Sequence, residues 1–311
     1  MSVPRKRRPG DPQLDLFAEL EPDPGPPPSP SGIAPGAAFP ANFAAGTCAF
    51  QHQHWRGKFY PAGLSPRREL AFYAQYANAV EIDGSFYRVP AKPTVQRWLA
   101  ETPPGFRFAL KAPKSLTHDA QLDLDNAAAR ADWLGLTELL PLFGDRLAAV
   151  LLQLGPWTAA KSERHLRRLL EGLGGAFPVA VEFRHASWNT APVNSMLRAL
   201  GATRAWTDAY LDPRRGVAEG DPLLIEETGP FIYLRLLGDV STKYNVLTGA
   251  LNHEYGSMLF DRRADLERWA DRIRAALSRG VPVQCFINNH YEGFSPMTVE
   301  TLRRALSGER P

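Results

Sequence analysis

The chain has 311 residues, 44% of them hydrophobic, so it can bury a large core, either as two ordinary domains or as one α/β barrel. A net charge of +3 excludes a strong global attraction for nucleic acid, which leaves only local clusters of Lys and Arg for that purpose. Two cysteines, Cys48 and Cys285, are too few for a disulfide framework, and no run of about eighteen apolar residues occurs, so we expect a cytoplasmic protein with buried thiols and no membrane contact.

Residues 1–40 form the first distinct segment, which is dense in Pro, Gly, Ser and charge. Such a segment lacks the apolar area that would offset the entropy lost on ordering. We therefore predict a disordered, Pro-rich tail. One compact apolar stretch, QLDLF at residues 13–17, stands out inside it.

Beyond the tail, short runs rich in β-branched and aromatic residues alternate with amphipathic stretches. This alternation is typical of repeated βα units around a parallel sheet. Eight such units in about 270 residues predict an α/β fold, a TIM-like (β/α)8 barrel that occupies residues 41–311. The predicted strands are 44–50, 79–87, 106–112, 148–154, 179–185, 202–208, 231–238 and 281–289.

The connecting segments carry helix signals, with one exception. Ser65-Pro66 and Ser295-Pro296 each predict a helix start, in which a capping hydroxyl precedes proline at the first helical position. The stretch 209–230 lacks a helical period, so a long loop is expected there.

The side-chain alternation of the strands predicts a polar barrel interior. In the second strand, Val80 and Ile82 belong under the helices, which leaves Glu81 and Asp83 inside. These charges lie toward the carboxyl ends of strands, where barrel enzymes place their sites, so we favour a functional pocket. The alternative is that the charges only neutralise one another. The same phase places Arg107, Lys111, Gln153, Glu182, Arg184, Tyr233, Arg235, Gln284 and Asn288 inside.

This interior favours acid–base chemistry on an anion. Glu81 and Glu182 can serve as general acid and base, as in a hydrolase or lyase, while cationic side chains bind a phosphate or carboxylate group. No cofactor or metal is predicted; the alternative, a divalent ion held by Glu81, Glu182 and His290, would have to compete with Arg184 for Glu182. A second alternative is a non-catalytic small-molecule binder or adaptor that uses the same pocket for recognition.

Motifs at the strand ends resemble the YecE-like family, catalogued as domain of unknown function 72. The matching stretches are WRGKFYP, VEIDGSFYRVP, FRFALKAPKSLTH, LLQLGP, VEFRHASW, YLRLLG and FINNHYEGFSP, in that order. The resemblance implies a TIM-like barrel with a polar mouth, and it implies no reaction. Leu237 stands where the family commonly has histidine, and Cys48 and Ala49 stand where a small polar residue and glycine are usual.

Strand phase and family resemblance together define the candidate site. The catalytic candidates are Glu81, Glu182 and His118. The substrate-binding candidates are Asp83, Tyr87, Lys111, Thr117, Arg184, Trp188, Tyr233, Arg235, Asn288, Asn289 and His290.

The apolar stretch in the tail resembles the bacterial sliding-clamp-binding motif, Gln-Leu-(Ser/Asp)-Leu-Phe. That resemblance implies that an extended peptide inserts its Leu and Phe into an apolar groove of the clamp, tethering the barrel. The alternative, docking of the stretch on the barrel's own surface, stays open. The clamp-binding residues would be Gln13, Leu14, Asp15, Leu16 and Phe17.

Overall fold

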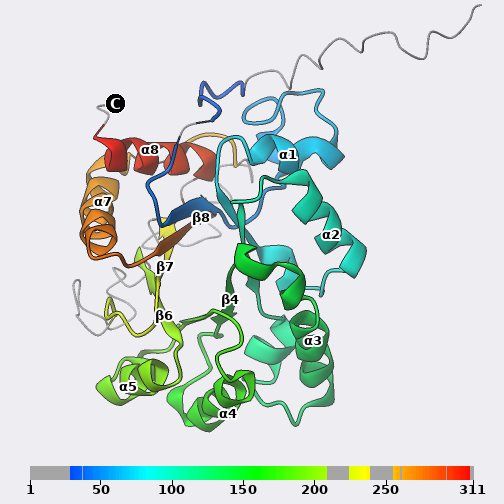
Figure 1. The fold of residues 1–311 in the computed structure, drawn as a ribbon, viewed down its shortest axis with the longest axis vertical. Helices are drawn as coiled ribbons and strands as arrows, with labels where there is room; N and C mark the ends of the chain where they lie inside the picture. The colour runs from blue at the N-terminus through cyan, green and yellow to red at the C-terminus, as the bar shows by residue number, and fades with distance from the viewer. Residues whose placement is uncertain are drawn as a thin grey trace, which may run out of the picture.

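The computed structural model describes residues 29–36, 38–208, 224–238, 255–259, 261–291 and 293–308. Eight parallel strands form one sheet in the order β1-β8-β7-β6-β5-β4-β3-β2, with helices on its outside (Figure 1). The predicted TIM-like (β/α)8 barrel is thereby confirmed. Its strands are β1 (Phe43–Thr47), β2 (Ala79–Ile82), β3 (Arg107–Lys111), β4 (Leu147–Gln153), β5 (Val179–Glu182), β6 (Thr203–Thr207), β7 (Ile232–Gly238) and β8 (Val283–Tyr291).

The outer layer consists of helices of uneven length. In the described part of the chain, none is long and apolar enough to cross a bilayer. Most of the loop predicted at residues 209–230 lies outside the described residues. Its last residues, 224–230, contain neither helix nor strand. The helices are α1 (Glu69–Tyr73), α2 (Lys92–Glu101), α3 (Ala127–Thr137), α4 (Glu163–Leu173), α5 (Ala191–Ala199), α7 (Arg263–Ser278) and α8 (Ser295–Ser307).

A helix begins at each of the two predicted Ser-Pro pairs, but neither serine caps its helix through its side chain. Ser65 precedes a short 3-10 turn and makes no side-chain capping bond. Ser295 is itself the first residue of α8, and its backbone N–H donates to Asn289 Oδ1 at 2.8 Å. The end of β8 therefore caps α8 through an amide side chain, which a local sequence pattern does not reveal.

The alternation of strand side chains follows the predicted phase. Val80, Phe108 and Leu152 pack in the main apolar cluster under the helices. The inner layer is built largely of alanine, and Glu81 stands in register with Ala109 of the neighbouring strand. Small inner side chains leave room beside them for long charged ones.

Side chains close the barrel between β1 and β2, because no backbone ladder joins these strands among the described residues. The Asn78 amide accepts from Ala45 N at 2.7 Å and donates to Phe43 O at 2.9 Å. The Tyr73 hydroxyl lies 2.7 Å from Thr47 N, from which it accepts. These two residues satisfy the backbone groups that a ladder would otherwise pair.

The packed chain starts earlier than predicted. Ser29 N donates to the Tyr76 hydroxyl at 3.0 Å, and Ser29 Oγ donates to Phe59 O at 2.8 Å. Ile33 is 5% exposed in the main apolar cluster. A tail boundary at residue 40 is therefore too late, and the motif at residues 13–17 lies outside the described residues.

Candidate active site

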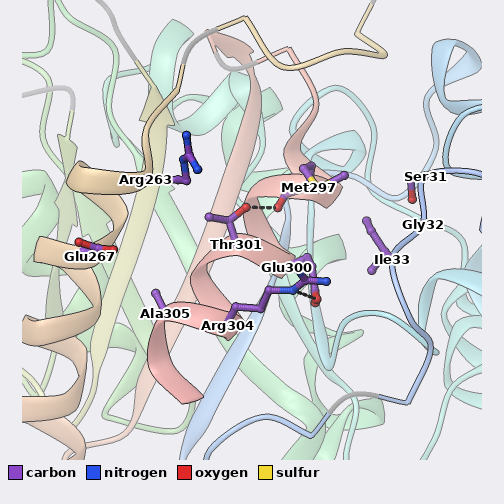
Figure 2. Close-up of a pocket in the computed structure, with 10 residues that line it drawn as sticks. All are labelled: Ser31, Gly32, Ile33, Arg263, Glu267, Met297, Glu300, Thr301, Arg304 and Ala305. Carbon is purple, nitrogen blue, oxygen red and sulfur yellow. Dashed lines mark hydrogen bonds and ion pairs between the residues drawn. The ribbon is translucent and has the colours of Figure 1, made fainter. Parts of the chain in front are cut away.

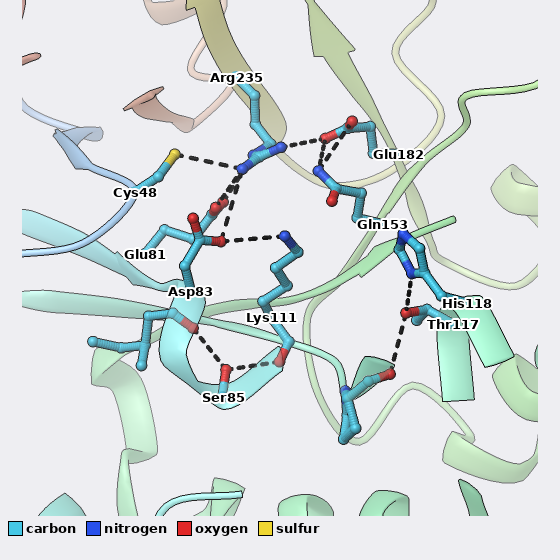
Figure 3. Close-up of polar contacts among 12 residues, drawn as sticks. Cys48, Glu81, Asp83, Ser85, Lys111, Thr117, His118, Gln153, Glu182 and Arg235 are labelled. Atoms are coloured by element: carbon cyan, nitrogen blue, oxygen red, sulfur yellow. Dashed lines mark hydrogen bonds and ion pairs between the residues drawn. The ribbon is translucent and has the colours of Figure 1, made fainter. Parts of the chain in front are cut away.

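A buried ionic cluster centred on Arg235 lies inside the barrel near the carboxyl ends of the strands (Figure 3). Arg235 of β7 is 1% exposed. Its guanidinium donates to Glu81 Oε1 at 2.7 Å and Oε2 at 3.1 Å, and to Glu182 Oε2 at 2.6 Å. Because β2, β5 and β7 are not neighbours in the sheet, this one side chain joins three walls of the barrel.

Further donors complete the coordination of both carboxylates. The Tyr233 hydroxyl donates to Glu81 Oε2 at 2.6 Å. Glu182 accepts from Gln153 Nε2 at 3.0 and 3.1 Å and from Arg184 Nε at 2.8 Å. All four carboxylate oxygens thus accept at least one hydrogen bond, as buried charges require.

The pKa values of the two glutamates are shifted in opposite directions. Burial raises the pKa of Glu81 above its ordinary value, and the attraction of Arg235 only partly opposes this. Burial acts on Glu182 as well, but the guanidinium groups of Arg235 and Arg184 and the Gln153 amide hold its pKa well below the usual range. Glu182 therefore stays ionised, while Glu81 is the carboxyl that takes up a proton more readily.

Partly exposed charges surround the opening of this cluster. Lys111 Nζ at the end of β3 lies 3.4 Å from Asp83 Oδ1 and 4.3 Å from the Phe86 ring centroid. The side chains of Lys111 and Arg184 are 12% and 27% exposed. Both cations therefore keep contact with solvent while their partners hold them in place.

His118 stands beside these cations as a neutral imidazole. Burial, followed by the positive charges of Arg184, Lys111 and Lys114, lowers its pKa to about 4. Its Nδ1 lies 2.9 Å from the Thr117 hydroxyl, which donates to Pro113 O at 3.1 Å. With the hydroxyl proton used there, the ring donates through Nδ1–H, which leaves Nε2 as an acceptor.

The remaining candidates divide between rim and scaffold. Tyr87 is 82% exposed on the rim. Trp188 is fully buried, stacks on Phe183 at 4.7 Å and donates from Nε1 to Thr158 O, so it supports the wall and cannot touch a ligand in this state. Asn289 is likewise a structural residue because it caps α8.

Two further candidates on β8 complete the set. Asn288 is 7% exposed near the carboxyl end of β8 and has polar contacts of its own. The side chain of His290 lies outside the described part of the structure.

Sequence reasoning missed two residues that the structure brings to the site. Cys48 Sγ lies 3.5 Å from Arg235 Nη2, and burial raises the pKa of its thiol well above the ordinary value. Trp157 is 56% exposed and donates from Nε1 to His118 O at 3.1 Å. The sequence signal for Trp157 is its position just after the fourth predicted strand, in LGPW.

The donor atoms near Arg235 also bear on metal binding. Among the described residues, Cys48, Glu81 and Asp83 bring ligand atoms within 4.8 Å of one another. The Arg235 guanidinium lies among them, 2.7 Å from Glu81 and 4.0 Å from Asp83. A resident cation of fixed charge thus occupies the place that a metal ion would need, and these residues do not fit one well.

Fold and cluster together define a TIM-like barrel protein with a charged mouth at the carboxyl ends of its strands. The family model described as "Protein of unknown function DUF72" matches residues 44–311, and the chain belongs to this family. It is 28% identical to the UPF0759 protein YunF of Bacillus subtilis over 174 residues, 54% of this chain and 61% of YunF.

Two other relatives agree with this assignment. The UPF0759 protein YecE of Escherichia coli K12 is 32% identical over 117 residues, 37% of this chain and 41% of YecE. The chain therefore matches less than two thirds of either curated relative. The crystal structure of a DUF72 family protein from Thermotoga maritima has a TM-score of 0.67 at 24% identity, covering 86% of this chain and 99% of that chain, which supports the fold.

Proposed function

We propose that the barrel mouth binds an anionic, phosphate-bearing substrate, a nucleotide or DNA, and acts on it as a hydrolase or lyase. The observation that supports this most is the gathering of cations beside His118, where burial and the charges of Arg184, Lys111 and Lys114 lower the pKa of the imidazole. Lys111 and Arg184 are partly exposed beside it, so an incoming anion can reach them.

In this proposal the local environment of each group decides which one is the acid and which one is the base. Glu81, whose pKa is raised, is the acid candidate, and His118 accepts a proton through Nε2. Glu182 stays ionised and orients Arg184 and Arg235. In the same proposal, Asp83, Tyr233 and Asn288 either hold these side chains in position or line the barrel mouth.

One observation favours the alternative, a binder without turnover. Every oxygen of Glu81 and Glu182 already accepts a hydrogen bond from within the barrel. A carboxylate engaged in this way must exchange a partner before it can transfer a proton to a ligand. Binding and turnover therefore have to be measured separately.

We expect Lys111→Met and Arg184→Met each to weaken the binding of an anionic ligand about 10-fold or more, because each removes a charge-assisted hydrogen bond. A panel of nucleotides and nicked, damaged and flapped DNA would be tested by calorimetry and for turnover. The matched control is Arg274→Met, which removes an exposed guanidinium on α7 that pairs with Asp271 of the same helix and donates to Ala305 O of α8.

The same panel separates enzyme from binder. Loss of turnover with retained binding in Glu81→Gln or His118→Asn supports catalysis, because these are the two proposed proton-transfer groups. Binding without turnover in the wild type supports the non-catalytic alternative. Binding that is equally strong in Lys111→Met, Arg184→Met and wild type contradicts the proposed anion site.

The second part of the proposal is a tether to the replication clamp through residues 13–17. It rests on the sequence QLDLF. The clamp acts on DNA in the bacterial cytoplasm, so the tether places the barrel there and suits a role in DNA replication or repair. It also brings a phosphate-binding mouth to its substrate by raising the local concentration.

The competing location for this stretch is a pocket on the outside of the barrel (Figure 2). The pocket measures about 290 Å³ and lies between residues 31–33 and helices α7 and α8. Ile33, Met297 and Ala305 supply its apolar lining. Twelve residues of extended chain can span roughly 40 Å, so Phe17 could reach the pocket from Ser29.

A peptide of residues 11–20 should bind isolated clamp by itself, because all its anchors are local in sequence. Replacing Leu16 and Phe17 with Ala removes two buried side chains worth about 2 kcal/mol each, and should weaken clamp binding about 1,000-fold by calorimetry. Asp15→Ser, which keeps the motif, is the matched control. Unchanged clamp affinity in the double variant, or a lowered thermal stability of its barrel, would favour docking in the pocket.

A further inference from the structure

A continuous row of aromatic rings runs along the rim of the barrel mouth. The Tyr87 and Phe86 centroids are 5.0 Å apart, those of Phe86 and His118 are 4.9 Å apart, and those of His118 and Trp157 are 5.6 Å apart. These residues follow β2, β3 and β4, which are adjacent strands, so the rings share one side of the mouth. We call the four residues the aromatic rim.

The two ends of the aromatic rim are exposed. Tyr87 is 82% and Trp157 is 56% exposed, and the only other large hydrophobic side chain so exposed among the described residues is Leu134. Exposed aromatic rings are costly to leave in water and are common where a ligand covers them. Two of three such side chains thus stand at the mouth that holds the ionic cluster.

Trp157 is held in position although it is exposed. Its Nε1 donates to His118 O at 3.1 Å. A Cβ at position 155 would lie 2.9 Å from Trp157 Cε2, so Gly155 lets the indole lie against the backbone. The ring is therefore fixed before any ligand arrives, which lowers the entropic cost of stacking on it.

Cations lie beside the same rings. Lys111 Nζ is 4.3 Å from the Phe86 ring centroid, and Arg184, Lys111 and Lys114 lie close enough to the His118 ring to lower its pKa. Rings that offer a stacking face next to cations that accept phosphate are the combination that binds nucleotides and single strands. A hydrophobic ligand would need the rings alone, and an inorganic anion would need the cations alone.

The geometry points to a nucleobase subsite on the aromatic rim, in which an unpaired base stacks on Trp157, the ring that is held in position, while its phosphate meets Lys111 and Arg184. This deepens the proposed function and rests on it. A base inside a duplex hides its faces against its neighbours, so the ligand is a free nucleotide, a single strand or a base extruded from a duplex.

The test compares three probes on full-length protein by fluorescence anisotropy: a labelled oligothymidylate, an abasic oligonucleotide with the same number of phosphates, and an intact duplex. Trp157→Ala should weaken oligothymidylate binding on the order of 5- to 100-fold and leave the abasic probe within about 2-fold. Trp157→Phe should restore most of the loss, since a ring remains. The matched control is Leu134→Ala, which removes the other exposed side chain.

The sources of the base are distinguished in the same assay. Competition by thymidine monophosphate identifies a free nucleotide as sufficient, and competition only by longer strands identifies single-stranded DNA. The inference is overturned if Trp157→Ala weakens both oligonucleotides equally, weakens neither, or if no probe binds the wild type. If Lys111→Met loses binding while Trp157→Ala does not, the stacking subsite fails and the proposed anion site stands.

Discussion

Replacing Arg235 with methionine is expected to destabilise the fold by about 3–5 kcal/mol, because the change leaves Glu81 and Glu182 buried without their shared cation. Both carboxylates are at most 1% exposed, so water cannot replace the lost partner without opening the barrel. Denaturant unfolding would measure the loss. Arg184→Met is the matched control, since Arg184 is 27% exposed and contacts only one of the two glutamates.

The deficit of Arg235→Met should shrink as pH falls. In the wild type the depressed pKa of Glu182 stabilises the fold above the unfolded pKa, and that contribution is lost as pH falls through the folded pKa. Without Arg235, Glu81 loses the attraction that opposed burial while Glu182 keeps Arg184, so Glu81 binds a proton more readily in the folded variant than in the unfolded chain. The variant should therefore gain stability relative to the wild type as pH falls from neutral toward the unfolded pKa of a glutamate, about 4.3.

Neutral replacements offer a rescue. Adding Glu81→Gln and Glu182→Gln to Arg235→Met removes the unpaired charge of Glu81 and the charge of Glu182, which only Arg184 still pairs, and the triple variant should recover most of the lost stability. A triple variant as unstable as Arg235→Met would show that the guanidinium acts through packing or its other hydrogen bonds, not through charge. Wild-type stability in Arg235→Met at neutral pH would contradict the buried ionic cluster altogether.

The triple variant also tests whether the buried charges serve only the fold or ligand binding as well. A rescued triple variant that folds but has lost ligand binding would show that the charges serve function beyond their mutual neutralisation. Nothing in folding alone requires a buried arginine between two glutamates beside an inner layer built largely of alanine, because apolar replacements often fold as well or better. The cluster is therefore a useful place to look for selection on function.

The barrel could be predicted from the sequence because strand patterns are local. Each strand carries outward apolar residues such as Val80 and Leu152, and that alternation also fixed which charges face inward. The predicted inward positions of Glu81, Glu182 and Arg235 are confirmed by their contacts. Arg107, also predicted inside, is exposed at the start of β3 and donates to Asp145 O, because the alternation gives the face of a side chain and not its depth in the barrel.

The geometry of the site depends on distant contacts that no local pattern contains. Arg235 reaches Glu81 across 154 positions of sequence, so its central place between two carboxylates emerges only in three dimensions. Trp188 resembles a site residue in its motif, yet it stacks into the outer wall. Trp157 follows a proline in a loop, where no periodicity marks its side chain as part of the site.

The closure of the barrel could not be predicted from the sequence either, because it too depends on contacts between residues that are distant in the chain. Gly46 permits β1 to approach β2 so closely that a Cβ at position 46 would lie 1.8 Å from Ala79 O and 2.7 Å from the Tyr73 hydroxyl. The Tyr73 hydroxyl also lies 3.1 Å from Ala79 O, to which it donates. A methyl group there would meet backbone on one side and a bridging hydrogen bond on the other.

Gly46→Ala is therefore expected to cost more than about 4 kcal/mol and to lower the Tm by roughly 10 °C or more, because neither neighbour is a flexible side chain that can move aside. The matched control is Gly172→Ala on the exposed face of α4, where a Cβ has nothing within 4 Å. That change should stabilise the protein by about 0.4–1 kcal/mol, since alanine loses less backbone entropy in a helix. Calorimetry of both variants compares the two positions, and a Gly46→Ala protein with the wild-type Tm would mean that Tyr73 and Asn78 do not hold β1 against β2.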